Sequence, residues 1–234
     1  MSSRVVTAAA AIVAAAWTIG CGFSMAPAGP VVHEHHDVDR GAAKQARIEI
    51  QMSAGDLEVK SGAAKLLEGD FDFNVPVLKP AIAYSVSGDT GALKVSQESS
   101  TGNVENKWRL SLDDKTPVDL VISLGAGDSD LELGRLNLRS LEVSLGAGDL
   151  KLDLRGTPAS SYGVKVQAGA GDVTIELPAS VGISAGTSGL IGDSNVNGLE
   201  KRDGRWTNPR ASGSPVTVTL DVQHAIGDLR ISAH

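Results

Sequence analysis

The residues best suited to chemistry are aspartates that return at the end of one short motif. Gly-Ala-Gly-Asp ends at Asp128, Asp149 and Asp172, and a looser Gly-Asp form ends at Asp193, with spacings of 21, 23 and 21 residues. Aligned carboxylates could bind Ca²⁺, which accepts carboxylate and backbone oxygens. They could instead accept hydrogen bonds from backbone N–H groups of their own turns. The spacing differs from that of tandem calcium-binding nonapeptides, so we expect turn capping and keep calcium as the alternative.

A second group of possible ligands lies near the N-terminus. His33, His35 and His36 fall within four residues, interleaved with acidic residues. Neutral imidazoles and carboxylates can hold Zn²⁺ or Cu²⁺. The surrounding small and polar residues, with prolines, predict a flexible tether over residues 21–46, which offers no fixed ligand geometry. We expect a solvated polar linker, with a weak accessory metal site as the alternative.

A third candidate site interrupts the repeat near the C-terminus. Trp206 lies there among basic residues that include Arg202 and Arg205. An exposed tryptophan among arginines would suit a sugar or an anionic polymer, through stacking and charge. The alternative is that Trp206 folds back over the last part of the core and protects an exposed sheet end.

Neither catalysis nor nucleic-acid binding finds support in the chain. Its carboxylates are spread over periodic positions, and outside the histidine tract the only histidines are His224 and His234. No nucleophile motif is present, so we predict that the protein is not an enzyme and has no cofactor, a polysaccharide-active enzyme being a distant alternative. The formal charge is −7 without a basic run. Phosphate binding needs clustered Lys and Arg, which argues against nucleic acid.

The first residues predict export. Arg4 is followed by an apolar stretch over residues 5–17, which is short for a bilayer span and typical of a secretory signal peptide, here residues 1–20. The run Thr18-Ile19-Gly20-Cys21 resembles the lipobox of bacterial lipoproteins. That resemblance implies cleavage before Cys21 and acylation of this cysteine, for example with palmitate. Gly22 after the cysteine favours the outer membrane of the cell envelope by the same resemblance.

The remaining chain must supply the frame that positions these residues. From residue 47 onward apolar and polar residues alternate with period two, as in Val118, Leu120, Ile122 and Leu124, and no long segment has helical period. Aromatic residues are 3% of the chain, so the core must be aliphatic. Each glycine motif between two strands could be a hairpin loop, but one motif at one period favours stacked coils. We predict one all-β domain over residues 47–234, a β-solenoid with coils of about 21–23 residues.

The Gly-Ala-Gly-Asp series, the Gly192-Asp193 ending, the excursion at Trp206 and the Gly227-Asp228 pair resemble the toast-rack, or putative-adhesin, β-solenoid family, including the C-terminal domain of LiaF-type proteins. Together with the lipobox and the lack of catalytic motifs, this resemblance leads us to predict a non-catalytic, lipid-anchored cell-envelope protein that is an adhesin-like surface or periplasmic interaction module or a structural module. Its expected partners are the membrane, through the lipid anchor, and an envelope polysaccharide or protein. A calcium- or polysaccharide-binding envelope protein is the alternative.

Overall fold

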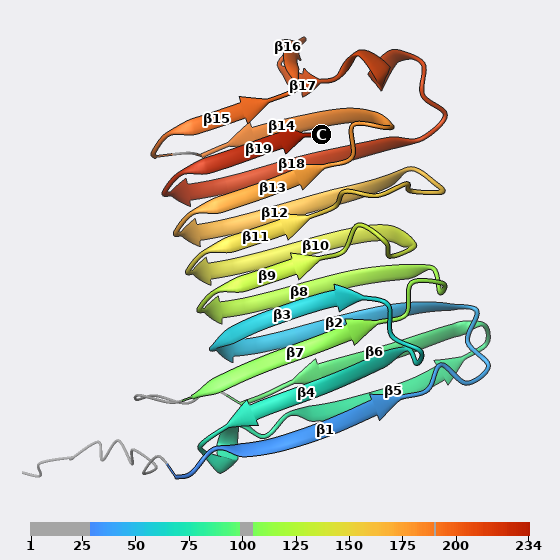
Figure 1. Ribbon diagram of the computed structural model, residues 1–234, viewed down its shortest axis with the longest axis vertical. Helices are drawn as coiled ribbons and strands as arrows, with labels where there is room; N and C mark the ends of the chain where they lie inside the picture. The colour runs from blue at the N-terminus through green and yellow to red at the C-terminus, as the bar shows by residue number, and fades with distance from the viewer. Residues whose placement is uncertain (1–28, 99–104, 190) are drawn as a thin grey trace, which may run out of the picture.

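The alternating sequence folds into two facing β-sheets that run the length of an elongated stack (Figure 1). The structure is a computed structural model, and it describes residues 29–98, 105–189 and 191–234. Within these residues sheet A has nine strands and sheet B has ten. No helix in this part of the chain is long and apolar enough to cross a bilayer.

The spatial order of the strands differs from their order in the sequence. Sheet A contains, from one end to the other, β1 (Val32–Val38), β4 (Leu67–Phe73), β7 (Asn106–Leu112), β3 (Asp56–Ser61), β9 (Ser129–Glu132), β11 (Leu150–Asp153), β13 (Val173–Leu177), β19 (Leu229–Ala233) and β15 (Ser194–Asn197). Sheet B contains β16 (Glu200–Arg202), β17 (Arg205–Thr207), β14 (Gly182–Ser188), β18 (Thr217–Ile226), β12 (Tyr162–Ala170), β10 (Leu138–Ala147), β8 (Val118–Ala126), β2 (Gln45–Ala54), β6 (Thr90–Ser96) and β5 (Ala81–Ser87). Two short 3₁₀ turns are η1 (Pro76–Leu78) and η2 (Pro209–Ser212).

Each central coil is one strand of sheet B, a glycine corner and one strand of sheet A. Thus β8 leads into β9, β10 into β11 and β12 into β13, and equivalent strands of successive coils pair in parallel. A hairpin would instead pair the two strands of one coil antiparallel. The β-solenoid prediction is therefore confirmed, and the hairpin alternative is wrong for these corners.

The corner glycines are required by the close approach of one coil to the next. Gly148 has φ of 123°, a conformation that favours glycine. A Cβ added to Gly148 would lie 2.6 Å from the carbonyl carbon of Gly127 in the preceding coil, and closer still to its oxygen. The same contact recurs one coil further on, where Gly171 meets Gly148. A side chain at this position would therefore push two coils apart.

The coils themselves are reordered at both ends of the stack (Figure 1). The coil formed by β2 and β3 lies between β6–β7 on one side and β8–β9 on the other. The last coil, β18–β19, is inserted between β12–β13 and β14–β15. Insertion gives both edges of the final strands a hydrogen-bonded neighbour, instead of leaving one edge open.

The predicted flexible tether is wrong for part of its length. Residues 32–38 of the predicted tether, 21–46, form β1, which pairs antiparallel with β4 along its whole length. Few apolar residues mark β1 because it is a sheet edge, where charged and polar side chains are common. The signal peptide, residues 1–20, and the predicted lipidation site Cys21 lie outside the described residues.

The core is a continuous column of aliphatic side chains between the sheets. The inward positions of β8 illustrate its composition, with Val118, Leu120, Ile122 and Leu124 all buried. Aromatic packing is concentrated towards the N-terminal end, where the rings of Phe71 and Trp108 meet edge to face with centroids 5.3 Å apart. The expectation of an aliphatic core from the low aromatic content is confirmed.

Candidate functional site

The repeated aspartates form a ladder that links coils. Asp149 donates its backbone N–H to Oδ1 of Asp128 at 3.0 Å, and Asp172 donates to Oδ1 of Asp149 at 2.8 Å. Asp228 then donates to Oδ1 of Asp172 at 3.1 Å, and Asp193 to Oδ1 of Asp228 at 3.3 Å. The four aspartates of the sequence series share this ladder, and the inserted last coil brings Asp228 between Asp172 and Asp193. The prediction of capping within one turn is wrong, because the acceptor serves the next coil.

Hydrogen bonds in the ladder also offset the repulsion between neighbouring carboxylates. The backbone N–H of Asp228 is the main reason why the pKa of Asp172 lies below its ordinary value, and the guanidinium of Arg230 adds to the effect. Arg230 lies 3.4 Å from Asp172 Oδ2 and 3.0 Å from Asp228 Oδ2. Among the described residues no group of three or more His, Cys, Asp or Glu side chains is arranged to hold a metal ion. Calcium at the corners stays the alternative hypothesis.

The histidine tract is divided between two faces of β1. His33 Nδ1 lies 2.6 Å from Asp72, and His35 Nδ1 lies 2.7 Å from Asp70 on the neighbouring strand. The hydrogen bond to Asp70 is the main reason why the pKa of His35 is raised, with Asp37 contributing. His36 points to the other face, where its ring centroid is 5.8 Å from that of Phe71. The strand therefore keeps His33 and His35 on one face and places His36, the third candidate metal ligand, on the other.

The third candidate site is also divided. Trp206 and Arg205 are neighbours on β17, so their side chains leave opposite faces of the β16–β17 hairpin. Arg205 donates to Ser184 Oγ at 2.7 Å and lies 2.8 Å from Asp221, and Arg202 lies 2.7 Å from Glu200. Trp206 is partly buried and packs against the core. That position is the one expected of the end cap, and it does not combine Trp206 with the two arginines in one binding surface.

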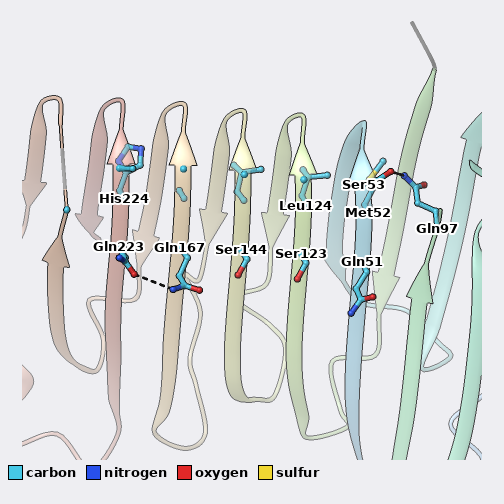
Figure 2. A pocket seen from close by; sticks show the side chains of 17 residues that line it. Gln51, Met52, Ser53, Gln97, Ser123, Leu124, Ser144, Gln167, Gln223 and His224 are labelled. Atoms are coloured by element: carbon cyan, nitrogen blue, oxygen red, sulfur yellow. Dashed lines mark hydrogen bonds between the residues drawn. The ribbon is translucent and has the colours of Figure 1, made fainter. Parts of the chain in front are cut away.

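A groove on the outer face of sheet B was not predicted from the sequence. Figure 2 shows its polar row, which we call the glutamine–serine groove, and its volume is about 720 Å³. Parallel pairing places one member of this row on each of five adjacent strands, β2, β8, β10, β12 and β18. The row consists of Gln51, Ser123, Ser144, Gln167 and Gln223.

The groove is hollow because small residues at the start of the glycine corners form one side of it. Two residues after each member of the row the chain has only a small residue, as at Gly125, Gly146 and Gly169. These residues line the groove but add no bulk to it. A sequence signal for the groove does exist, since an uncharged polar residue stands two positions before the start of each of these corners. The sequence alone does not bring these residues together, because only the parallel register aligns them across neighbouring strands.

One known protein family matches this chain through the N-terminal and central coils. Residues 27–176 match the family described as the N-terminal domain of toast_rack, DUF2154. This match covers more than half of the chain. The chain belongs to the toast-rack family. The family resemblance expected from the Gly-Ala-Gly-Asp corners is therefore confirmed.

Solved structures extend the likeness of this toast-rack chain over most of its length. It is similar to a putative cell adhesion protein from Clostridium sporogenes ATCC 15579, with 25% identity and a TM-score of 0.79, over 88% of this chain and 100% of that one. It also matches a putative adhesin from Bacteroides fragilis NCTC 9343, with 12% identity and a TM-score of 0.32, over 88% and 98% of the two chains. That second likeness is too low in TM-score to carry an argument. No curated protein matches the toast-rack chain in sequence.

Proposed function

We propose that this toast-rack protein is a non-catalytic, adhesin-like module that is exported and anchored by lipid to the bacterial cell envelope. The observation that carries the proposal is the likeness to the Clostridium sporogenes protein, described as a putative cell adhesion protein, over 88% of this chain at a TM-score of 0.79. Repeat proteins commonly bind partners through extended faces, such as the outer faces of the two long sheets here.

A non-catalytic role is supported by the ion pairing of two outward carboxylates, Asp153 and Glu176. Asp153 lies 2.6 Å from Arg155, and Glu176 lies 2.9 Å from His234. A glycosidase needs one carboxyl that stays protonated near neutral pH, which burial in an apolar setting provides. Instead, the hydrogen bond from Arg155 is the main reason why the pKa of Asp153 is lowered. Such a carboxylate suits an ion pair on a protein surface better than proton transfer.

Lipid anchoring at Cys21, by the lipobox resemblance, would fix the orientation of the stack. Gly29, eight residues after Cys21, donates its backbone N–H to Asn74 at 2.8 Å. A chain of eight residues reaches at most about 29 Å. The end of the stack that carries β1 and β5 would therefore face the membrane, and the β16–β17 hairpin would point away from it (Figure 1). In this orientation the long outer faces of both sheets stand upright and accessible, as a surface module requires.

Adhesion is tested by deleting the gene in the bacterium that carries it and measuring attachment of the cells to one another and to surfaces coated with envelope polymers. Deletion should reduce attachment, and the wild-type chain should restore it. The Cys21→Ala chain should be exported without acylation and should fail to restore attachment, because the module is no longer held on the cell. Incorporation of labelled palmitate into the wild-type chain, and its absence from Cys21→Ala, reports the anchor independently.

The adhesive role and the lipid anchor can be refuted separately. Unchanged attachment after deletion would overturn the adhesive role. Equal palmitate labelling of the wild-type and Cys21→Ala chains would overturn anchoring at this cysteine. Restoration of attachment by the Cys21→Ala chain would mean that the module works without the lipid.

A further inference from the structure

We infer that the glutamine–serine groove binds an extended, uncharged polysaccharide. The inference rests on the proposed adhesive function and names the surface and the class of ligand through which it acts. The groove crosses five adjacent strands of sheet B (Figure 2), whose separation of about 4.8 Å makes the row about 19 Å long. A row of that length can contact several consecutive sugar units of one chain.

The groove favours a neutral ligand, because the one titratable side chain in its lining, His224, is fully buried. Its lining has no Asp, Glu, Lys or Arg, although 21% of the chain is charged. On the adjoining part of the same face the charges are paired with each other. Lys165 lies 3.1 Å from Glu142, Arg47 lies 2.9 Å from Glu49, and Arg205 lies 2.8 Å from Asp221. An anionic polymer would lose its water in this groove and gain no cation in return.

The row offers hydrogen bonds that the protein does not use. Gln167 Nε2 donates to Gln223 Oε1 at 3.3 Å, which leaves the outer amide groups of both side chains free for a ligand (Figure 2). Figure 2 marks no hydrogen bond from the hydroxyls of Ser123 and Ser144 or from the amide of Gln51 to another residue of the lining. Amides and hydroxyls both donate and accept. Sugar hydroxyls do the same, so the two surfaces are chemically matched.

The arrangement does not suit an added peptide strand. A peptide that joins a sheet needs an open edge, where backbone N–H and C=O groups lack partners. The strands under the groove are internal: β8 pairs with β2 and β10, and β12 pairs with β10 and β18. Their backbone groups are already used. Because successive coils repeat the same groups at one spacing, the groove fits a polymer whose own units also repeat.

Binding is tested with the full-length chain by affinity electrophoresis in gels that contain one polysaccharide each. The neutral probes are dextran, a β-1,3-glucan, a mannan and a galactan, and the anionic probe is alginate. Ser144→Arg places a long side chain in the groove, and Gln167→Ala removes one amide. Thr174→Arg is the matched control, because Thr174 also faces outward but lies on β13 in the opposite sheet. Circular dichroism checks that all three variants fold.

We expect retardation by at least one neutral polysaccharide. Loss of one amide should lower the association constant about fivefold in Gln167→Ala, while Ser144→Arg should lower it tenfold or more. Thr174→Arg should bind as the wild type does. Retardation by alginate alone, absence of retardation by every neutral probe, or equal retardation of Ser144→Arg and wild type would each overturn the inference. Tight binding of an uncharged peptide that competes with the sugar in the groove would overturn it too.

The cell assay separates this inference from the adhesive function itself. If the Ser144→Arg chain restores attachment to the deletion strain as well as the wild type does, the module is adhesive but the groove is not its binding surface. If neither chain affects attachment while Ser144→Arg loses sugar binding, the groove is a sugar site and the adhesive function is wrong.

Discussion

Replacing Gly148 by alanine tests the stacking of the coils most directly. The new Cβ would lie 2.6 Å from the carbonyl carbon of Gly127, and φ at Gly148 is 123°. Backbone in such a region costs a residue with a side chain about 1–3 kcal/mol. To relieve the overlap the two coils must separate at the corner. Separation strains the two backbone hydrogen bonds that join these coils at the corner, from Gly127 N–H to Ala147 O and from Ser129 N–H to Asp149 O, both 2.9 Å long.

The expected loss of stability follows from these two parts. Weakening two backbone hydrogen bonds costs about 0.5–1.5 kcal/mol each. Together with the backbone strain, Gly148→Ala should lower the free energy of unfolding by about 4 kcal/mol. In a domain of this size that corresponds to a fall in melting temperature of roughly 8–16 °C. Urea unfolding and thermal melts, both followed by circular dichroism at the β-sheet band, measure the two quantities.

Three other glycines separate the two causes. Gly62 has φ of 113° with open space around its Cβ position, so Gly62→Ala measures the backbone strain alone. Gly146 lacks a positive φ, but its Cβ would overlap the carbonyl oxygen of Gly125, so Gly146→Ala measures the overlap alone. Gly163 has neither problem, and Gly163→Ala should be neutral or slightly stabilising.

The pattern across the series decides between the two causes. Gly148→Ala should be the most harmful, and Gly62→Ala and Gly146→Ala intermediate. The reasoning is refuted if Gly146→Ala is as stable as Gly163→Ala and Gly148→Ala loses no more than Gly62→Ala, because coil contact would then cost nothing. Should Gly148→Ala not fold at all, the comparison of Gly146→Ala with Gly163→Ala still tests the contact.

Three further perturbations follow from the ladder, the edge strand and the core. Asp149→Ala removes the acceptor for the backbone N–H of Asp172 and should lower the free energy of unfolding in urea by about 1 kcal/mol, whereas Asp149→Asn keeps a carbonyl acceptor and should lower it less. Equal losses of unfolding free energy in the two variants would argue against the ladder. In the folded protein His35 should titrate by NMR above its ordinary pKa of 6.5, so its contribution to stability is present at low pH and is lost as pH rises through the folded pKa. If the pKa of His35 is unchanged in Asp70→Asn, the hydrogen bond to Asp70 is not the cause of the shift. Trp108 is fully buried, and Trp108→Ala should lose about 3–5 kcal/mol, while a loss under about 1 kcal/mol would contradict its place in the core.

Local patterns in the sequence were sufficient to predict the architecture. A strand shows alternate side chains to opposite faces, so period-two alternation predicts strands and the composition of the core without any knowledge of distant contacts. The return of Gly-Ala-Gly-Asp at Asp128, Asp149 and Asp172 predicts stacked coils for the same reason, since each coil needs one tight corner. β1 was missed because an edge strand buries little, and its polar residues resemble those of a linker.

The arrangement of the candidate sites could not be read from the sequence in the same way. Coils of similar composition can stack on one another in more than one order, and only pairing between distant segments inserts Asp228 between Asp172 and Asp193. Register likewise decides that the polar residues before each corner form one groove. Pairing with β4 decides that residues 32–38 are a strand, and alternation along that strand turns His36 away from His33 and His35. The sequence by itself determined the strands, the corners and the aliphatic core, because these follow from the geometry of neighbouring residues. The tertiary structure decided which coils touch and which side chains share a surface, because those depend on hydrogen bonds between strands far apart in the chain.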